Sequence, residues 1–432
     1  MKIYLNVVVI LITTSITPYI NAGNLGLNKA VFLAIENDDW LQSSELKESA
    51  FRDESTSHGE LPDPVMSIGV ANLPTDSWDF DQENMTQLKL GVTQRFPGGD
   101  SRKLKARKSQ LMADVNPYQR VERKARLTLT VSHLWLDSYF AWRSIALIEN
   151  DRYLFEQLVD VATARYQSAL GKARQQDIVR AQLELTKLED RLTRLHMQYD
   201  ANRQLLAQWL PAHSLYMPLT QQLPSNKSMG IVSLDVLEKS INKHPQLRIS
   251  DKQIEIQQTD IDLAKQDYKP GWALNASYGY REDAPTGMQR SDFFSVGVSF
   301  DIPLFTSKRQ DKTVSASASR KQALSIDYQL LHKKLLSQAL KTQSELERLA
   351  ERSSLYENKL LKQVHEQAEA LLSAYTNDDG DFADVMRAYI AELNSKIEAL
   401  EINIKQRKAL ATMKYLLAGD NIDIRENSYA YQ

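Results

Sequence analysis

Residues Pro64–Pro97, PVMSIGVANLPTDSWDFDQENMTQLKLGVTQRFP, decide the fold because a second copy follows at Pro270–Pro303, PGWALNASYGYREDAPTGMQRSDFFSVGVSFDIP. The two bounding prolines of the first copy recur after the same interval of 206 residues. Within each copy, two runs that alternate apolar with small or polar residues flank a polar loop. Side chains alternate across a strand, so this pattern predicts strands over 64–73, 85–96, 271–281 and 293–302.

Each predicted strand has one apolar face and one small or polar face. The apolar set consists of Met66, Ile68, Val70, Leu88, Leu90, Val92, Trp272, Leu274, Ala276, Tyr278, Tyr280, Phe294, Val296, Val298 and Phe300. A soluble sheet shows this alternation when its apolar face rests on a core. Runs of about nine or ten residues that are rich in aromatics also suit a membrane barrel with an apolar exterior and a polar lumen. The strands alone leave both interpretations open.

The amino terminus predicts export. Lys2 precedes the apolar run 7–12, and Ala22 offers a small residue before a cleavage point at Gly23. We interpret 1–22 as a secretory signal peptide, with an uncleaved membrane anchor as the alternative. No later stretch reaches 18 consecutive apolar residues, which a spanning helix requires. The chain has no cysteine, so disulfides and a lipid attached to cysteine are excluded. The net charge of −2 gives no support for nucleic-acid binding.

Long helical stretches follow each strand pair. A helix over 27–51 precedes the first pair, and a helical hairpin over 101–210 follows it, with a kink or break expected at Asn116-Pro117. A connector, 211–232, leads to the second repeat, 233–418, whose hairpin covers 307–418, and 419–432 is a polar tail. The return arm of each hairpin shows a 3.5-residue apolar period that is typical of a coiled-coil seam. The first repeat therefore covers 23–210.

This duplication limits how the strands could enter a membrane. Four strands cannot close a barrel with an interior, and an open sheet edge is not tolerated in lipid. Three chains would supply twelve strands, which is wide enough for an aqueous lumen. Arms of roughly 65 residues would then extend about 100 Å as a helical tube. The expected fold class is therefore an α+β membrane protein, with a trimeric 12-stranded outer-membrane barrel that continues as a periplasmic α-helical tube.

The sequence resembles the TolC-type outer-membrane efflux proteins. The resemblance rests on the signal peptide, the duplicated strand and hairpin unit, the tip RYQSALG at 165–171 and the tip at 375–384. Leu61–Pro64, Asn72–Pro74, Met85-Thr86 and Gln94–Gly99 are most similar to the heavy-metal branch of that family. The resemblance implies an exit duct in the outer membrane of a Gram-negative bacterium. It also implies a homotrimer, a periplasmic adaptor (a membrane fusion protein), and an inner-membrane resistance–nodulation–division (RND) pump that exports metal cations. Drugs or polypeptides are alternative cargo.

The sequence indicates no enzyme chemistry. Its seven histidines lack metal-ligand spacing, and it contains no phosphate-binding loop motif, so we expect no catalytic, cofactor-binding or metal-binding residue. Acids cluster instead at the second tip, namely Asp378, Asp379, Asp381 and Asp384. In a trimer each would form a three-fold ring that favours cations at a constricted mouth. The resemblance supports such a gate, because TolC-type channels close at this end. The alternative is that aspartates simply suit a turn and the start of a helix.

The resemblance also implies that both tips contact the adaptor. The candidate residues are Tyr166, Leu170, Gly171, Ile178 and Val179 on the first tip and Tyr375, Gly380, Phe382 and Val385 on the second. The alternative for each is packing within the turn. Met66 and Met85 lie at the strands, where apolar filling is a simpler explanation than metal ligation. A hypothesis from another class is a periplasmic coiled-coil adaptor or scaffold whose strands form a small soluble domain.

Overall fold

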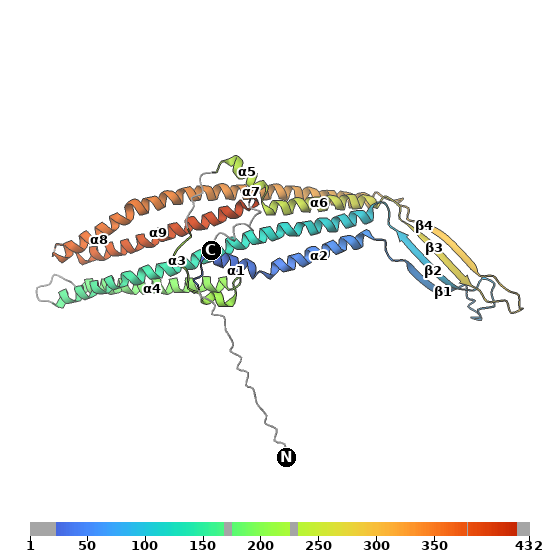
Figure 1. Ribbon diagram of the computed structural model, residues 1–432, viewed down its shortest axis with the longest axis horizontal. Helices are drawn as coiled ribbons and strands as arrows, with labels where there is room; N and C mark the ends of the chain where they lie inside the picture. Colours follow the sequence, from blue (N-terminus) through green and yellow to red (C-terminus); the bar gives the residue numbers. More distant parts are fainter. Residues whose placement is uncertain (1–22, 168–174, 225–231, 378, 421–432) are drawn as a thin grey trace, which may run out of the picture.

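The computed structural model describes residues 23–167, 175–224, 232–377 and 379–420 (Figure 1). The predicted signal peptide therefore lies outside the described residues. The molecule is elongated, with a four-stranded sheet at one end and the tips of two helical hairpins at the other (Figure 1).

Two short helices precede each strand pair, where a single helix over 27–51 was predicted. They are α1, Leu27–Glu36, and α2, Asp39–Gly59, in the first repeat, and α5, Leu234–Asn242, and α6, Pro245–Gln266, in the second. The prediction was wrong because Asp38 starts a new helix: its carboxylate accepts a hydrogen bond from the Trp40 N–H at 3.4 Å. His244 caps α6 in the same way, accepting from the Gln246 N–H at 3.2 Å. These two caps are 206 residues apart, as the bounding prolines are.

The strands lie within the four predicted runs and form one antiparallel sheet. They are β1, Val65–Ala71, β2, Gln87–Phe96, β3, Trp272–Tyr280, and β4, Phe293–Phe300. Their order is β1-β2-β3-β4, so the inner strands of the two repeats pair with each other. β1 and β4 are the edge strands. The sheet therefore has two open edges within one chain.

The first hairpin consists of α3, Ser101–Gln167, and α4, Gln175–Leu206. The kink or break predicted at Pro117 does not interrupt α3, which is one helix of 67 residues. Proline cannot donate to the carbonyl four residues earlier. The Asn116 side-chain amide supplies donors there instead, to the Met112 carbonyl at 3.1 Å and the Ala113 carbonyl at 3.4 Å. The connector contains a short 3-10 helix, η1, Ala212–Tyr216.

The second hairpin has an outgoing arm of three consecutive segments. These are α7, Gln310–Leu355, a π-helical turn η2, Tyr356–Leu360, and α8, Leu361–Thr376, and the return arm is α9, Phe382–Leu416. A 3-10 turn, η3, Ala418–Asp420, follows. A π-helical turn accommodates one extra residue. It accounts for one of the three residues by which the interval between repeats grows, from 206 at the prolines to 209 at the tip glycines.

The core lies between the hairpins and follows the predicted seams. In α4, Ala181, Leu188 and Leu192 are buried, and in α9 so are Met386 and Leu393. They belong to one cluster with residues of α3 and α8. A second cluster surrounds Trp135, whose indole N–H donates to the Leu25 carbonyl at 2.9 Å. The hairpins thus pack on each other, whereas the sheet lies apart from both clusters (Figure 1).

Candidate functional site

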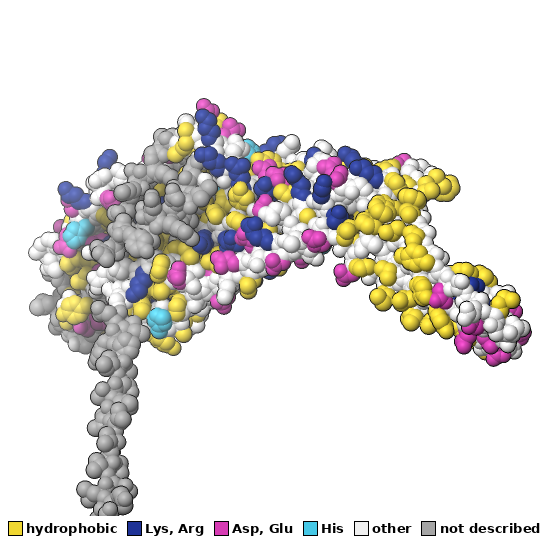
Figure 2. All heavy atoms as spheres, turned by 45° about the vertical axis from the view of Figure 1, so that its right-hand side comes forward, with side chains coloured by type: hydrophobic (Ala, Val, Ile, Leu, Met, Phe, Trp, Pro, Cys, Tyr) yellow, Lys and Arg dark blue, Asp and Glu magenta, His cyan; other side chains and the backbone are white. Residues whose placement is uncertain are grey.

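One face of the sheet is apolar and exposed across all four strands. Residues opposite each other in an antiparallel pair share a face, and the register places Ile68, Leu90, Tyr278 and Phe294 in one row. Their exposed fractions are 75, 45, 47 and 72%. The strands pack mainly against one another, and the spheres of this arm form a broad apolar surface (Figure 2). A soluble protein rarely exposes a contiguous apolar surface of this kind without a partner.

The opposite face of the sheet carries small and polar side chains. One row contains Thr93, Asn275 and Gly297. The Thr93 hydroxyl donates to the Asn275 Oδ1 at 2.8 Å, and the Asn275 amide donates to the Ser299 hydroxyl at 3.4 Å. These contacts leave this face hydrophilic. The sheet therefore separates an apolar surface from a polar one, as a barrel wall between lipid and water does.

The two loops at the far end of the sheet are tied to each other by arginines. Arg290 donates to the Asp81 carbonyl at 3.0 Å and to the Asn84 side-chain oxygen at 2.7 Å. Arg281 donates to the Asn84 carbonyl at 3.0 Å. Acidic and basic side chains are both present at this end of the arm (Figure 2). The loops of the two repeats are therefore held together away from the helices.

The second hairpin turns tightly between α8 and α9. The Asp379 N–H donates to the Ala374 carbonyl at 2.9 Å. A Cβ atom on Gly380 would lie 2.7 Å from the Tyr375 backbone nitrogen, so only glycine fits there without a shift. The Tyr375 and Phe382 rings pack edge to face with centroids 5.6 Å apart. The tip is thus a defined turn with its own small core.

The tip aspartates participate in local contacts. The Asp381 carboxylate accepts a hydrogen bond from the Ala383 N–H at 2.8 Å and caps α9. Asp384 forms an ion pair with Arg387. Asp379 and Asp381 are exposed, and Asp378 lies outside the described residues. These contacts match the alternative in which the acids stabilise the turn and the helix start. An acidic ring needs further copies of the chain and stays a proposal.

The candidate adaptor contacts are placed unequally. Tyr166 and Val179 are 49 and 57% exposed, and Ile178 is half-buried. Leu170 and Gly171 lie outside the described residues. Gly380 is exposed, and its contact with an adaptor stays a proposal.

Three apolar tip residues are buried instead of presented to a partner. Phe382 is 3% exposed, Val385 is fully buried and Tyr375 is 5% exposed. All three belong to the core cluster between the hairpins. The expectation that Phe382 and Val385 form a contact surface is therefore corrected in this conformation: packing of α9 against the neighbouring helices removes both side chains from the surface.

A polar cluster close to the tips joins the two hairpins, and sequence reasoning missed it. The nearly buried Glu392 carboxylate lies 3.0 Å from the His365 Nδ1 and 3.1 Å from the Lys396 Nζ. Lys396 also contacts Asp151 of α3 at 3.2 Å. The Glu392 and Lys396 spacing of four residues indicates a helix ion pair. Nothing in the spacing indicates the partners on α3 and α8.

Tyr389 extends this cluster toward α8. Its hydroxyl donates to the Glu369 carboxylate at 3.3 Å. Burial, followed by the negative charge of Glu369, raises the pKa of Tyr389 to about 12. The side chain therefore stays a neutral hydrogen-bond donor between the arms of the second hairpin.

Several other classes of site are not found in the described part of the chain. No group of three or more histidine, aspartate or glutamate side chains there could hold a metal ion. Within the same residues, no helix is both long and apolar enough to cross a membrane. The exposed apolar sheet and the tips are therefore the candidate functional features.

No protein-family model and no curated protein matches the sequence. Solved structures do match. The chain superposes on the outer-membrane channel OprN with a TM-score of 0.76 and 14% identity, covering 91% of this chain and 90% of that one. For CusC the TM-score is 0.74 at 13% identity, with 91 and 94% covered. For the outer membrane protein VceC of Vibrio cholerae it is 0.75 at 13% identity, with 91 and 96% covered. The chain therefore shares the fold of these proteins along nearly its whole length.

Proposed function

We propose that the chain is an outer-membrane channel of the TolC type, the exit duct of a tripartite efflux system. Three copies form a 12-stranded barrel in the outer membrane of a Gram-negative bacterium, and their hairpins form a tube in the periplasm. The duct is passive: it carries no cofactor and catalyses no reaction. OprN, on which the chain superposes over about nine-tenths of its length, is described as an outer-membrane channel, and VceC as an outer membrane protein, which supports this proposal.

One observation carries the proposal: the exposed apolar face of the sheet. The middle row across it is Met66, Val92, Ala276 and Val296, in which Met66 is 71% and Val296 62% exposed. In water this surface is unfavourable, at roughly 25 cal/mol for each Å² of apolar area. Lipid on that face removes the cost, and water fits the opposite face. Because lipid does not tolerate open strand edges, further copies must pair with β1 and β4.

The hairpin tips supply the proposed gate and adaptor site. Asp379, Asp381 and Asp384 of three chains would surround the mouth of the tube, and such rings favour cations. The exposed Tyr166 and Val179 are the residues that we assign to adaptor contact on the first tip. An inner-membrane RND pump supplies the energy, and the tips open when the adaptor binds.

We propose divalent or monovalent metal cations as the cargo. Support comes from the resemblance of Leu61–Gly99 to the heavy-metal branch and from the acidic tip. Drugs and polypeptides are the competing cargo classes. A deletion strain tested against a panel of metal salts and drugs distinguishes them: sensitivity to metals alone supports the assignment, and sensitivity to drugs alone contradicts it.

Membrane fractionation tests the channel itself against the rival adaptor function. We expect the full chain to sediment with outer membranes, to resist extraction with carbonate and to require detergent for solubility. A chain that stays in solution after membranes are removed would support a periplasmic scaffold instead. In that case the exposed sheet face would have to be covered by another protein.

A further inference from the structure

The molecule has two open lateral edges, each made of one strand and one helix. α2 packs on α3, α3 on α6, and α6 on α7, in the same order as the strands to which they connect. One edge of the molecule is therefore formed by β1 with α2, and the other by β4 with α7 (Figure 1). The seam between the two repeats, β2 against β3 and α3 against α6, joins the same kinds of element.

The contact between the two repeats of one chain provides a template for the contact between two copies of the chain. Shifting β1 by 206 residues and β2 by 208 turns the pair Met66–Val92 into Trp272–Phe300, which is the observed register of β3 and β4. Adding 208 to a residue number in β2 therefore gives its counterpart in β4, and subtracting 206 from a residue number in β3 gives its counterpart in β1. The observed pair Val92–Ala276 then becomes Phe300 against Val70 of another copy. Gln94–Leu274 becomes Ile302 against Ile68.

The segment after β4 fits this template. β4 ends at Phe300, but Ile302 and Leu304 continue the alternation and are 69 and 73% exposed. The Asp301 N–H donates to the Gly271 carbonyl at 3.0 Å. In an antiparallel strand, consecutive residues direct their N–H groups to opposite sides. The Ile302 backbone N–H therefore points to the open edge, and Pro303, which has none, lies in the position that faces β3.

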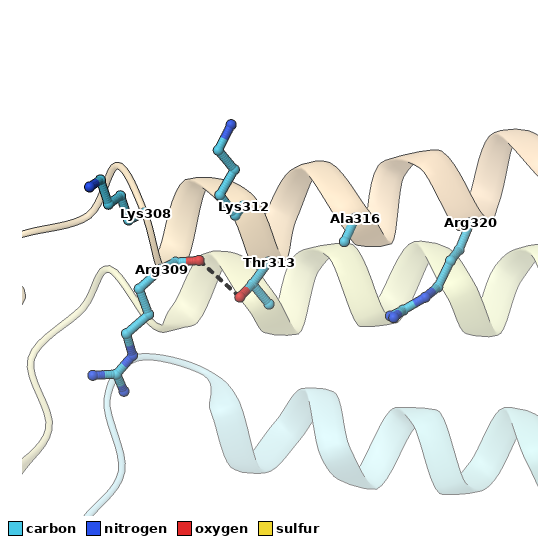
Figure 3. Close-up of a pocket in the computed structure, with 6 residues that line it drawn as sticks. All are labelled: Lys308, Arg309, Lys312, Thr313, Ala316 and Arg320. Atoms are coloured by element: carbon cyan, nitrogen blue, oxygen red, sulfur yellow. Dashed lines mark hydrogen bonds between the residues drawn. The ribbon is translucent and has the colours of Figure 1, made fainter.

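Exposed side chains of opposite charge lie on the two edges. Exposed cations line a shallow depression on and beside α7, namely Lys308, Arg309, Lys312 and Arg320. In Figure 3, Arg309 and Arg320 project to the same side of α7, whereas Lys312 points away from the neighbouring helices. Exposed acids lie on α2 and just after it, namely Asp53, Glu54, Glu60 and Asp63. None of these eight side chains has an ion pair within the described part of the chain.

The template brings these two charged rows to the same level. Within the chain, Lys108 of α3 and Asp260 of α6 form an ion pair at 2.7 Å. Shifting Lys108 forward by 208 residues gives Ala316 of α7, and shifting Asp260 back by 206 residues gives Glu54 of another copy. Lys312 and Arg320 each lie four residues from Ala316, about one helical turn away. Glu54 therefore lies at the same level of the seam as these two cations, about one helical turn from each.

We propose that these edges are the two halves of a subunit seam. β4 of one copy pairs with β1 of the next, Phe300 lies opposite Val70, and Ile302 lies opposite Ile68. The cations of α7 meet the acids of α2 along the same seam. This inference rests on the proposed function, because a shared barrel requires the edges to meet. It goes beyond that function by assigning the register and the charges that select the partner.

Disulfide crosslinking tests the register, because the natural chain has no cysteine to interfere. Purified protein with Ile302→Cys and Ile68→Cys should form covalent trimers on non-reducing gels after mild oxidation. In the control, Ile302→Cys with Met66→Cys, both cysteines lie on the same face of the sheet. The cysteine on β1 is two residues, about 6.6 Å, away from the proposed partner position. Disulfides need Cα atoms closer than about 7 Å, so we expect at least a ten-fold lower yield. Equal yields, or a higher yield in the control, overturn the register.

Charge reversal tests the ionic part of the seam. Lys312→Glu with Arg320→Glu should reduce the trimer fraction in detergent by at least five-fold, and adding Glu54→Lys with Glu60→Lys should restore it. Failure of the second pair to restore trimers overturns the charge assignment. The unmodified chain separates the two proposals. If the unmodified chain inserts into membranes and conducts ions but the Ile302→Cys, Ile68→Cys variant gives no crosslink, the seam is wrong. If the unmodified chain is a soluble monomer, the channel is wrong as well.

Discussion

The proposed barrel makes its most specific prediction for two neighbouring residues on β4 that lie on opposite faces of the sheet. Val296 is 62% exposed and belongs to the apolar face, whereas Ser295 is opposite Ser277 on the polar face. We consider replacing each by arginine, Val296→Arg and Ser295→Arg. Both positions lie in the same strand, so the substitutions differ almost only in the side of the sheet that receives the charge.

The size of the effect follows from the position of Val296 in the middle row of the sheet. An arginine on the lipid face near the bilayer midplane costs about 2–4 kcal/mol. Three copies in one barrel raise the cost to roughly 6–12 kcal/mol for the assembly. This is comparable to the whole stability of a typical domain, about 5–15 kcal/mol. Val296→Arg should therefore prevent stable insertion, whereas Ser295→Arg, which faces water, should cost less than about 0.5 kcal/mol.

The assay is folding of the purified chain into lipid vesicles across a urea series, followed by heat-modified migration on gels. We expect Val296→Arg to lose the folded, heat-modifiable band and Ser295→Arg to keep it. Equal midpoints for both variants would refute a lipid-facing wall, because a sheet with water on both faces has no reason to distinguish them. A larger loss for Ser295→Arg would mean that the faces are assigned in reverse.

Three further predictions concern the helices. Asp381→Asn with Asp384→Asn should lower the preference for cations in reversal-potential measurements while leaving stability intact, because asparagine caps a helix as well as aspartate; an unchanged reversal potential excludes the acidic ring. Gly380→Ala should destabilise the second tip by about 1–3 kcal/mol, because its Cβ would lie 2.7 Å from the Tyr375 nitrogen, and faster hydrogen exchange confined to this turn is the expected signature. Burial lowers the pKa of His244 below its ordinary 6.5, so the unfolded chain takes up the proton first and stability is lost as pH falls below about 6.5. In thermal melts between pH 7.5 and 5, His244→Asn should flatten this dependence, and an unaltered slope would assign it to another group.

The strands and the hairpins could be predicted because both follow from short-range patterns. The alternation of apolar with small or polar residues over Met66–Val70 and over Phe294–Phe300 is visible in the sequence, and the observed register places the apolar residues of both runs on one face. The seam through Leu188 and Leu192 is equally regular, and both residues are buried. The open edges are a consequence of the number of strands. The exposure of the apolar face required the structure, since an alternating strand fits a soluble core equally well.

The features that were missed depend on particular side chains rather than on periodicity. The break before α2 depends on one carboxylate, that of Asp38, and the continuity of α3 through Pro117 depends on the Asn116 amide. The cluster around Glu392 joins residues more than 200 positions apart, such as Asp151 and Lys396. Phe382 and Val385 were assigned to a surface because apolar residues beside a turn suit a partner or a core equally. Burial in the hairpin core distinguishes these cases, and sequence spacing does not.

The central claim is that lipid covers one face of this sheet and that several copies complete the wall around water. Recording current across a planar lipid bilayer after adding the purified, signal-free chain tests it most directly. We predict discrete conductance steps of uniform size that appear only with the assembled oligomer. A monomer that remains soluble without detergent and never raises the membrane current would contradict it.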